Sequence, residues 1–143
     1  MSKPFDQTLY EADDSAKHLV IRWLRSRDVV AFVNPDEYGI DLLGRYKGAD
    51  YAFEVEVKHN WRGFDFPYQT IHYSARKRKF VLPDYKTFFV TLNHERTRLL
   101  LVGHNDFMAG KLVSKDTIYT TSEWFVEIPI HRVIFREILE EEL

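Results

Sequence analysis

The sequence predicts an α/β domain in which a mixed central β-sheet is flanked by helices. Apolar residues recur every three or four positions from about Asp6 to Ser26, which is typical of an amphipathic helix. Short β-branched and aromatic runs follow, as in strands. A chain of 143 residues has the length of one ordinary domain. We expect one domain over residues 1–143, with a core at about 6–103 and a C-terminal extension of strands and a helix at about 104–143.

The expected elements follow one another without repeats or linkers. After the first helix we expect strands at 29–33, 40–46 and 50–59, the last two joined as a hairpin by a turn at Lys47–Asp50. Further strands are expected at 87–92, 98–102, 117–121 and 124–128. Helical segments are expected at about 75–81, 105–110 and 130–139, and the pattern at 64–73 leaves that segment unassigned.

Composition narrows the class of protein. The chain is 45% hydrophobic and 15% aromatic, which is enough to build a core and argues against disorder. It has no cysteine, which excludes disulfides, thiolate zinc sites and cysteine nucleophiles. No apolar run approaches a membrane span, and Met1–Pro4 open no secretory signal. We therefore expect a cytoplasmic protein without a membrane partner.

The net charge of −2 does not favour nucleic-acid binding, but the charges are unevenly distributed. Four cations are consecutive, namely Arg76, Lys77, Arg78 and Lys79, whereas Glu140–Glu142 are three consecutive anions. The basic run could contact phosphates or simply form the solvated face of a helix, and the sequence favours neither.

The expected strand at 50–59 has an unusual charged face. Phe53, Val55 and Val57 fall on one side, and Glu54, Glu56 and Lys58 on the other. Such a row in the middle of a small domain suggests a site. Pairing across the turn can bring Asp41, near the start of the preceding strand, to Glu56 and Lys58.

Those three residues suit one kind of chemistry. Two carboxylates supply the hard oxygens that Mg²⁺ or Mn²⁺ prefers, and the ion lowers the pKa of a bound water. A nearby ammonium can orient that water and stabilise charge developing on a phosphate. The set therefore fits phosphodiester hydrolysis.

The order of helix, strand, Gly39–Leu43 and then Glu56-Val57-Lys58 resembles the PD-(D/E)XK nuclease superfamily, particularly its Holliday-junction resolvases and small phage-type endonucleases. The resemblance implies a restriction-endonuclease-like αβββαβ core and a DNA endonuclease that hydrolyses phosphodiester bonds with a Mg²⁺-activated water, in the cytoplasm of a cell or of a phage host. It implies that Asp41, Glu56 and the Val57 carbonyl hold Mg²⁺ or Mn²⁺, and that Lys58 positions the water.

The resemblance has departures. Ile40 stands where the family name has proline, and the literal Pro35-Asp36 lies in an expected loop, so Asp41 is preferred. Many members add an acidic residue from the first helix. Asp13 and Asp14 are equal candidates here, with Glu11 behind them.

The resemblance also bears on DNA and partners. With a nuclease site nearby in the sequence, the basic run could contact DNA phosphates. Gln69 and Tyr73 could contact the DNA strand that is cut, in the manner of the polar residue on the second core helix of the superfamily. A homodimer is expected because cutting two strands needs two sites, with the aromatic C-terminal strands as its interface.

Less specific interpretations remain open. Asp41, Glu56 and Lys58 could form only cross-strand salt bridges. Glu54 could ligate a second metal or pair with Arg45 or Lys47, and His59 is at most a neighbour of the site. Trp61 and Phe64 fit the core better than base stacking. The alternative functions are a non-catalytic DNA-binding or assembly protein that retains the fold, an RNase, or a subunit of a larger nuclease.

Overall fold

A computed structural model describes the backbone of residues 7–116 and 122–143, and the side chains of residues 14–116 and 122–143. Its helices are α1 (Gln7–Arg25) and α2 (His104–Met108), with 3₁₀ turns η1 (Ala75–Phe80), η2 (Ile130–Arg132) and η3 (Glu140–Glu142). Its strands are β1 (Val30–Val33), β2 (Leu42–Tyr46), β3 (Ala49–Val57), β4 (Thr70–Ser74), β5 (Lys86–Leu92), β6 (Arg98–Gly103), β7 (Lys111–Lys115), β8 (Glu123–Pro129) and β9 (Ile134–Glu137).

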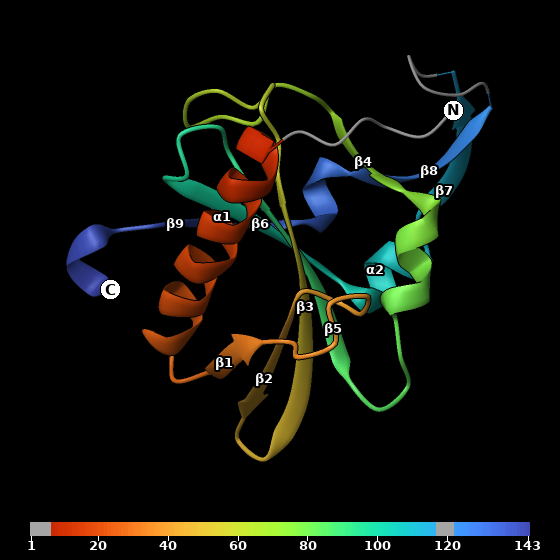
Figure 1. Ribbon diagram of the computed structural model, residues 1–143. Helices are drawn as coiled ribbons and strands as arrows, with labels where there is room; N and C mark the ends of the chain where they lie inside the picture. The colour runs from red at the N-terminus through yellow and green to blue at the C-terminus, as the bar shows by residue number, and fades with distance from the viewer. Residues whose placement is uncertain (1–6, 117–121) are drawn as a thin grey trace.

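The main sheet has the strand order β1-β2-β3-β5-β6-β9, and α1 lies across one of its faces (Figure 1). It is mixed, because β3 and β5 are parallel whereas the other neighbours are antiparallel. Val20 and Leu24 of α1 pack with Leu42, Phe53 and Val90 of the sheet in one buried cluster. The apolar face of β3 therefore faces α1, as its alternation predicts.

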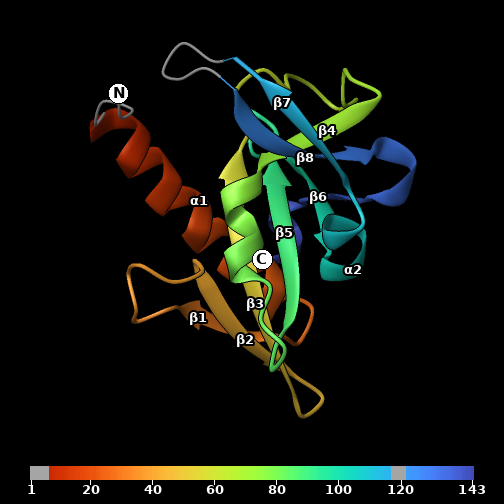
Figure 2. The ribbon, with the colours of Figure 1, turned by 90° about the vertical axis from the view of Figure 1, so that its right-hand side faces the viewer.

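A second sheet, with the order β4-β8-β7, lies against the other face of the main sheet, and η1 runs in front of β3 (Figure 2). Its buried cluster includes Trp61, Ile71, Phe89 and Phe107, and the rings of Phe89 and Phe107 stack with centroids 3.9 Å apart. Both faces of β3 are thus covered. The charged row of that strand lies between two layers of the fold, where a charge needs a partner.

A tight turn sets the register between β2 and β3. Tyr46 pairs with Ala49, so Lys47 and Gly48 alone form the loop, and both have positive φ, 49° and 78°. Positive φ at both central residues is the mark of a type I′ hairpin turn, whose twist matches that of the flanking strands. The four-residue turn expected at Lys47–Asp50 is wrong, because Ala49 and Asp50 belong to β3.

Most of the expected elements are confirmed. The first helix, the strands of the β2–β3 and β5–β6 hairpins, β1, β8 and the short helical segments at η1 and α2 lie where the patterns place them. The unassigned segment 64–73 contains the start of β4, and β7 had no predicted counterpart. The strand expected at 117–121 lies outside the described residues.

The helix expected at 130–139 is wrong. Only Ile130–Arg132 form a 3₁₀ turn, and Ile134–Glu137 form β9, which pairs antiparallel with β6 from Arg98 to Leu101. Hydrogen bonds to the open edge of β6 outweigh the weak helical preference of these residues. The C-terminal extension therefore contributes the last strand of the main sheet.

The stacked rings of Phe89 and Phe107 should contribute strongly to the unfolding free energy. Replacing the fully buried Phe107 by Ala removes the ring against Phe89 and should cost about 3–5 kcal/mol of unfolding free energy, measured by urea denaturation. Phe32→Ala is the control, because Phe32 is 46% exposed on an edge strand and should cost less than about 1 kcal/mol. Similar losses in both variants would show that the second cluster is not a packed core.

Candidate functional site

Asp41 lies opposite Glu54 in the structure. It immediately precedes β2, and the register that pairs Leu42 with Phe53 brings Asp41 level with Glu54. The Asp41 backbone N–H donates to Glu54 Oε1 at 3.2 Å, and the Val55 N–H donates to Asp41 Oδ2 at 2.9 Å. Glu56, the expected partner of Asp41, lies two residues further along β3. The two-residue turn causes this shift, because it moves every residue of β3 two positions further from the turn than a four-residue turn would.

Two lysines from separate elements neutralise this pair. Lys17 Nζ of α1 lies 3.1 Å from Asp41 Oδ1, and Lys77 Nζ of η1 lies 3.0 Å from Glu54 Oε2. Burial lowers the pKa of Lys77, but the charges of Glu54, Glu56 and Asp41 outweigh it and raise the pKa above its ordinary value. For Lys17 likewise, the lowering of the pKa by burial is outweighed by the charge and hydrogen bond of Asp41. Three carboxylates therefore act on one ammonium group, that of Lys77.

Glu54 is the most perturbed acid of this cluster. Its residue is only 8% exposed, and its pKa is raised to about 7. Burial is the main cause, the charge of Lys77 opposes it, and the like charge of Asp41 adds to it. Arg45, which the sequence offered as a partner for Glu54, pairs instead with Asp50 at 3.4 Å.

Glu56 and Lys58 form a second pair on the same face. Lys58 Nζ lies 3.0 Å from Glu56 Oε1 and donates to the His72 carbonyl at 3.0 Å. Glu56 Oε2 is buried and has no hydrogen-bond partner among the described residues. A buried carboxylate oxygen without a partner is costly, so it suggests that an ion or water belongs there. Val57 between them packs its side chain in the α1 cluster.

The acidic residues of the first helix are only partly described. The Asp14 carboxylate lies 3.7 Å from His18 Nε2, and its charge also acts on Lys17. The side chains of Glu11 and Asp13 lie outside the described residues. The described residue of α1 that reaches Asp41 is a lysine rather than the expected acid. The sequence contains a signal for this contact. Lys17 lies three residues before Val20 and seven before Leu24, so it shares their face of the helix.

The four side chains of the basic run, residues 76–79, do not all point the same way. Lys77 points inward to Glu54, and Arg76 pairs with Glu123 at 3.1 Å. Arg76, Arg78 and Lys79 are exposed. No sequence signal separates Lys77 from its neighbours, because the 3₁₀ turn of η1 decides which of the four faces β3. His59 is exposed and lies beside His94, with their Nδ1 atoms 3.4 Å apart.

Of the two polar residues expected to contact DNA, Gln69 and Tyr73, the structure buries one. Tyr73 lies on β4, in the segment that the sequence left unassigned, and is buried with its hydroxyl 2.6 Å from Thr91 Oγ1. Tyr73 therefore supports the core. Gln69 is exposed before β4. Trp61 is fully buried, as expected. The expectation that Phe64 lies in the core is wrong, because Phe64 is 55% exposed and its ring is covered on one side by the guanidinium of Arg98 at 3.7 Å.

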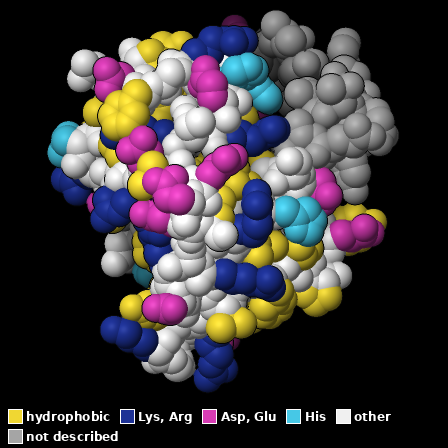
Figure 3. All heavy atoms as spheres, turned by 90° about the vertical axis from the view of Figure 1, so that its left-hand side faces the viewer, with side chains coloured by type: hydrophobic (Ala, Val, Ile, Leu, Met, Phe, Trp, Pro, Cys, Tyr) yellow, Lys and Arg dark blue, Asp and Glu magenta, His cyan; other side chains and the backbone are white. Residues whose placement is uncertain are grey.

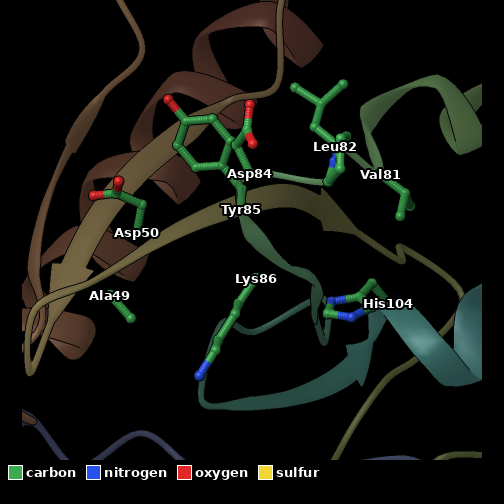
Figure 4. Close-up of a pocket in the computed structure, with 9 residues that line it drawn as sticks. Ala49, Asp50, Val81, Leu82, Asp84, Tyr85, Lys86 and His104 are labelled. Atoms are coloured by element: carbon green, nitrogen blue, oxygen red, sulfur yellow. The ribbon is translucent and has the colours of Figure 1, made fainter.

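The cluster lies near the carboxyl end of β3, between α1 and η1 (Figure 2). A separate cavity of about 630 Å³ lies at the amino end of β3, where it is lined by Asp50, Lys86 and His104. The polar side chains in Figure 4 are spread around this cavity rather than directed at one point. The face that carries the C-terminus has Lys and Arg interspersed with Asp and Glu (Figure 3). Neither this cavity nor this face brings charged groups together at one point, in the way that the carboxylates and lysines around β3 are brought together.

Comparison with known proteins identifies the fold. No protein-family model and no curated protein matches the sequence. The structure is similar to that of Hjc, a Holliday junction resolvase from the archaeal hyperthermophile Archaeoglobus fulgidus. The two share 12% sequence identity over 92% of this chain and 95% of Hjc, with a TM-score of 0.58.

The fold of this chain is restriction-endonuclease-like. The match to Hjc confirms the predicted fold class, a mixed central sheet flanked by helices. At this level of identity, the likeness concerns the fold. Among the described helices, none has the length and apolar character needed to span a bilayer.

The environment of Glu54 predicts an unusual titration. In metal-free protein, the NMR chemical shift of the Glu54 carboxyl carbon should change with a midpoint near pH 7 rather than near the ordinary 4.5. The folded state then holds a proton that the unfolded chain has released, so Glu54 should make unfolding free energy fall as pH rises from 4.5 to 7. The fall should exceed about 1 kcal/mol relative to Glu54→Gln. A midpoint at the ordinary value would mean that the carboxylate is solvated.

Proposed function

We propose that the protein is a metal-dependent DNA endonuclease of the PD-(D/E)XK type. The observation that carries the proposal is the convergence of Asp41, Glu54 and Glu56 on the ammonium of Lys77, inside a fold similar to that of a resolvase. Grouped carboxylates need a cation or a bound proton to offset their mutual repulsion. A divalent cation meets that need and brings chemistry that an ammonium cannot.

The donor set fits Mg²⁺ or Mn²⁺. Asp41, Glu54 and Glu56 offer carboxylate oxygens, and within the described part of the chain the buried Glu56 Oε2 has no hydrogen-bond partner. Among the described residues, no three acidic or histidine side chains already form a ligand cage, while Lys17 and Lys77 take up oxygens of Asp41 and Glu54. We assign Asp41, Glu56 and the Val57 carbonyl as ligands, with Glu54 as the acid that the hairpin register adds.

Residues of the chain would act together with the ion in the reaction. When bound, the ion neutralises phosphate charge and lowers the pKa of water at the site. Lys58 is held against Glu56 and the His72 carbonyl, so its ammonium has a fixed position beside the reacting phosphate. The exposed Arg76, Arg78 and Lys79 and the amide of Gln69 supply contacts to the DNA backbone.

A homodimer completes this proposal. Cutting two strands of a duplex or junction needs two sites, and one chain provides one. β9 is an edge strand of the main sheet, and its Ile134 is 44% exposed. Edge strands present unpaired backbone groups to a second chain. The C-terminal strands are therefore the proposed interface.

The proposal predicts loss of cleavage when its central pair is changed. Glu56→Gln and Lys58→Met should each lower Mg²⁺-dependent cleavage of branched and linear DNA by more than about 100-fold, because each removes a charge at the reacting phosphate. Glu141→Gln, an equivalent change in the exposed C-terminal turn, is the control and should cleave normally. Full activity in both site variants, with wild-type thermal stability, would refute the assignment.

Lys77 predicts a competition with the metal. Lys77→Met removes the ammonium that shares the oxygens of Glu54, so Mn²⁺ should bind at least about 10-fold more tightly by calorimetry at pH 8. Lys79→Met is the matched control, since Lys79 is exposed on the same turn and should leave the affinity unchanged. Unchanged or weaker Mn²⁺ binding in Lys77→Met would show that the ammonium and the ion use different oxygens.

One observation favours a second function. Two internal lysines already neutralise the carboxylates, as they would in a non-catalytic DNA-binding or assembly protein that retains the fold. This alternative predicts that purified protein binds no Mg²⁺ or Mn²⁺ in calorimetry and that its DNA affinity is the same in EDTA. An assay of linear, branched and single-stranded DNA together with RNA, in Mn²⁺, also separates a DNase from an RNase.

A further inference from the structure

A second cavity, of about 300 Å³, is lined by Lys58 but not by Asp41 or Glu54. It lies between the segment that follows β3 and the second sheet. Its lining includes two ammonium groups, Lys58 and Lys115, together with His72, Asn60, Phe66 and Tyr68. It thus combines positive charge with aromatic rings and neutral polar groups. The proposed metal site is built from carboxylates and gives these groups, apart from Lys58, no role.

The cationic side of this cavity is held in place by hydrogen bonds. Lys115 Nζ of β7 lies 2.7 Å from His72 Nδ1, and His72 Nε2 lies 2.9 Å from Glu127 Oε2. An ammonium can only donate, so Nδ1 accepts and Nε2–H donates to Glu127. The His72 carbonyl in turn accepts from Lys58. One residue of β4 therefore fixes both ammonium groups.

Both ammonium groups keep donors for a ligand. An ammonium has three N–H groups. The described contacts of Lys58, to Glu56 and to the His72 carbonyl, engage two of them, and Lys115 gives one to His72. An anion with several acceptor oxygens fits this arrangement, and a phosphodiester is such an anion.

The other side of the cavity presents an aromatic ring. Tyr68 is 51% exposed although two neighbours orient it. Its hydroxyl accepts from Asn60 Nδ2 at 3.3 Å, and its ring meets Phe66 edge to face with centroids 5.8 Å apart. An oriented, exposed ring beside fixed cations is the arrangement that binds single-stranded nucleic acid, where bases stack on aromatic side chains.

We infer that this cavity is a subsite for one unpaired nucleotide of the DNA strand, next to the phosphodiester that is cut. Lys58 and Lys115 contact its phosphate, and its base lies on Tyr68. A base stacked inside a duplex cannot enter such a cavity, so the subsite selects DNA with an unpaired nucleotide, as at a flap, gap or branch. The inference rests on the proposed function, since it places this cavity beside the proposed catalytic lysine.

The test measures binding without cleavage. A fluorescently labelled single strand and its duplex are titrated in EDTA by anisotropy, with wild type, Lys115→Met and Tyr68→Leu. Both altered side chains are exposed, so the fold should persist. Lys111→Met is the matched control, because it removes the same charge from the same strand but outside the cavity. Lys58 is left unchanged because it belongs to the proposed catalytic pair.

Lys115→Met and Tyr68→Leu should both weaken binding of the single strand, but only Lys115→Met should change its salt dependence. Each should weaken single-strand binding about 5–10-fold, with little change for duplex. Lys115→Met should also reduce the slope of log affinity against log salt by about 0.7, the value for one phosphate contact on a single strand, whereas Tyr68→Leu should leave the slope unchanged. Lys115→Arg should restore both affinity and slope, and Lys111→Met should match wild type.

Other results would overturn the inference. They are wild-type affinity in both variants, equal losses for single strand and duplex, an effect of Lys111→Met as large as that of Lys115→Met, or tighter binding of an RNA strand than of DNA. Cleavage is scored separately with Mn²⁺. If the protein cuts no DNA but the variants lose single-strand binding, the subsite stands and the nuclease proposal fails. If the protein cuts DNA normally and the variants bind like wild type, the nuclease proposal stands and the subsite fails.

Discussion

The contact between Asp41 and Glu54 organises the region around β3. Two carboxylates lie side by side in a covered part of the fold, and each has its own lysine, Lys17 from α1 and Lys77 from η1. Leaving either carboxylate charged and unpaired would be strongly unfavourable. The charge balance therefore ties three separate segments of the chain to one point of the main sheet: the helix, the hairpin and the 3₁₀ turn.

This balance is compatible with binding and releasing a divalent cation. The carboxylates require positive charge, and an ammonium supplies it without rigid coordination geometry. A divalent ion supplies more charge at the same oxygens. The pKa of Glu54 is raised mainly by burial, and the charge of Lys77 opposes that rise, so this group responds to the cation beside it. Lys58 is anchored instead to Glu56 and to the β4 backbone.

The second sheet contributes both to the core and to a polar cavity. β4, β7 and β8 cover the face of the main sheet opposite α1, and they bury Trp61, Phe89 and Phe107. The same strands carry His72, Lys115 and Glu127, whose hydrogen bonds form one side of the cavity beside Lys58. A layer that completes the core thus also extends the polar surface beyond the carboxylates. The buried core and the polar cavity therefore depend on the same strands.

The sequence by itself determined the first helix, most strands of the main sheet and the polarity of the central strand. Alternation placed Phe53 and Val57 toward a core and Glu54 and Glu56 away from it, because side chains of a strand alternate strictly between its faces. The spacing of apolar residues likewise located α1. Such patterns are local, so no knowledge of the rest of the chain is needed to interpret them.

Only the tertiary structure decided which charges meet. The turn at Lys47 and Gly48 has two residues rather than four, and this difference exchanged Glu56 for Glu54 as the neighbour of Asp41. The inward direction of Lys77, the burial of Tyr73 and the strand at 134–137 likewise depend on partners far away in the sequence. Register and side-chain direction follow from long-range pairing and packing, which a local pattern of residues does not contain.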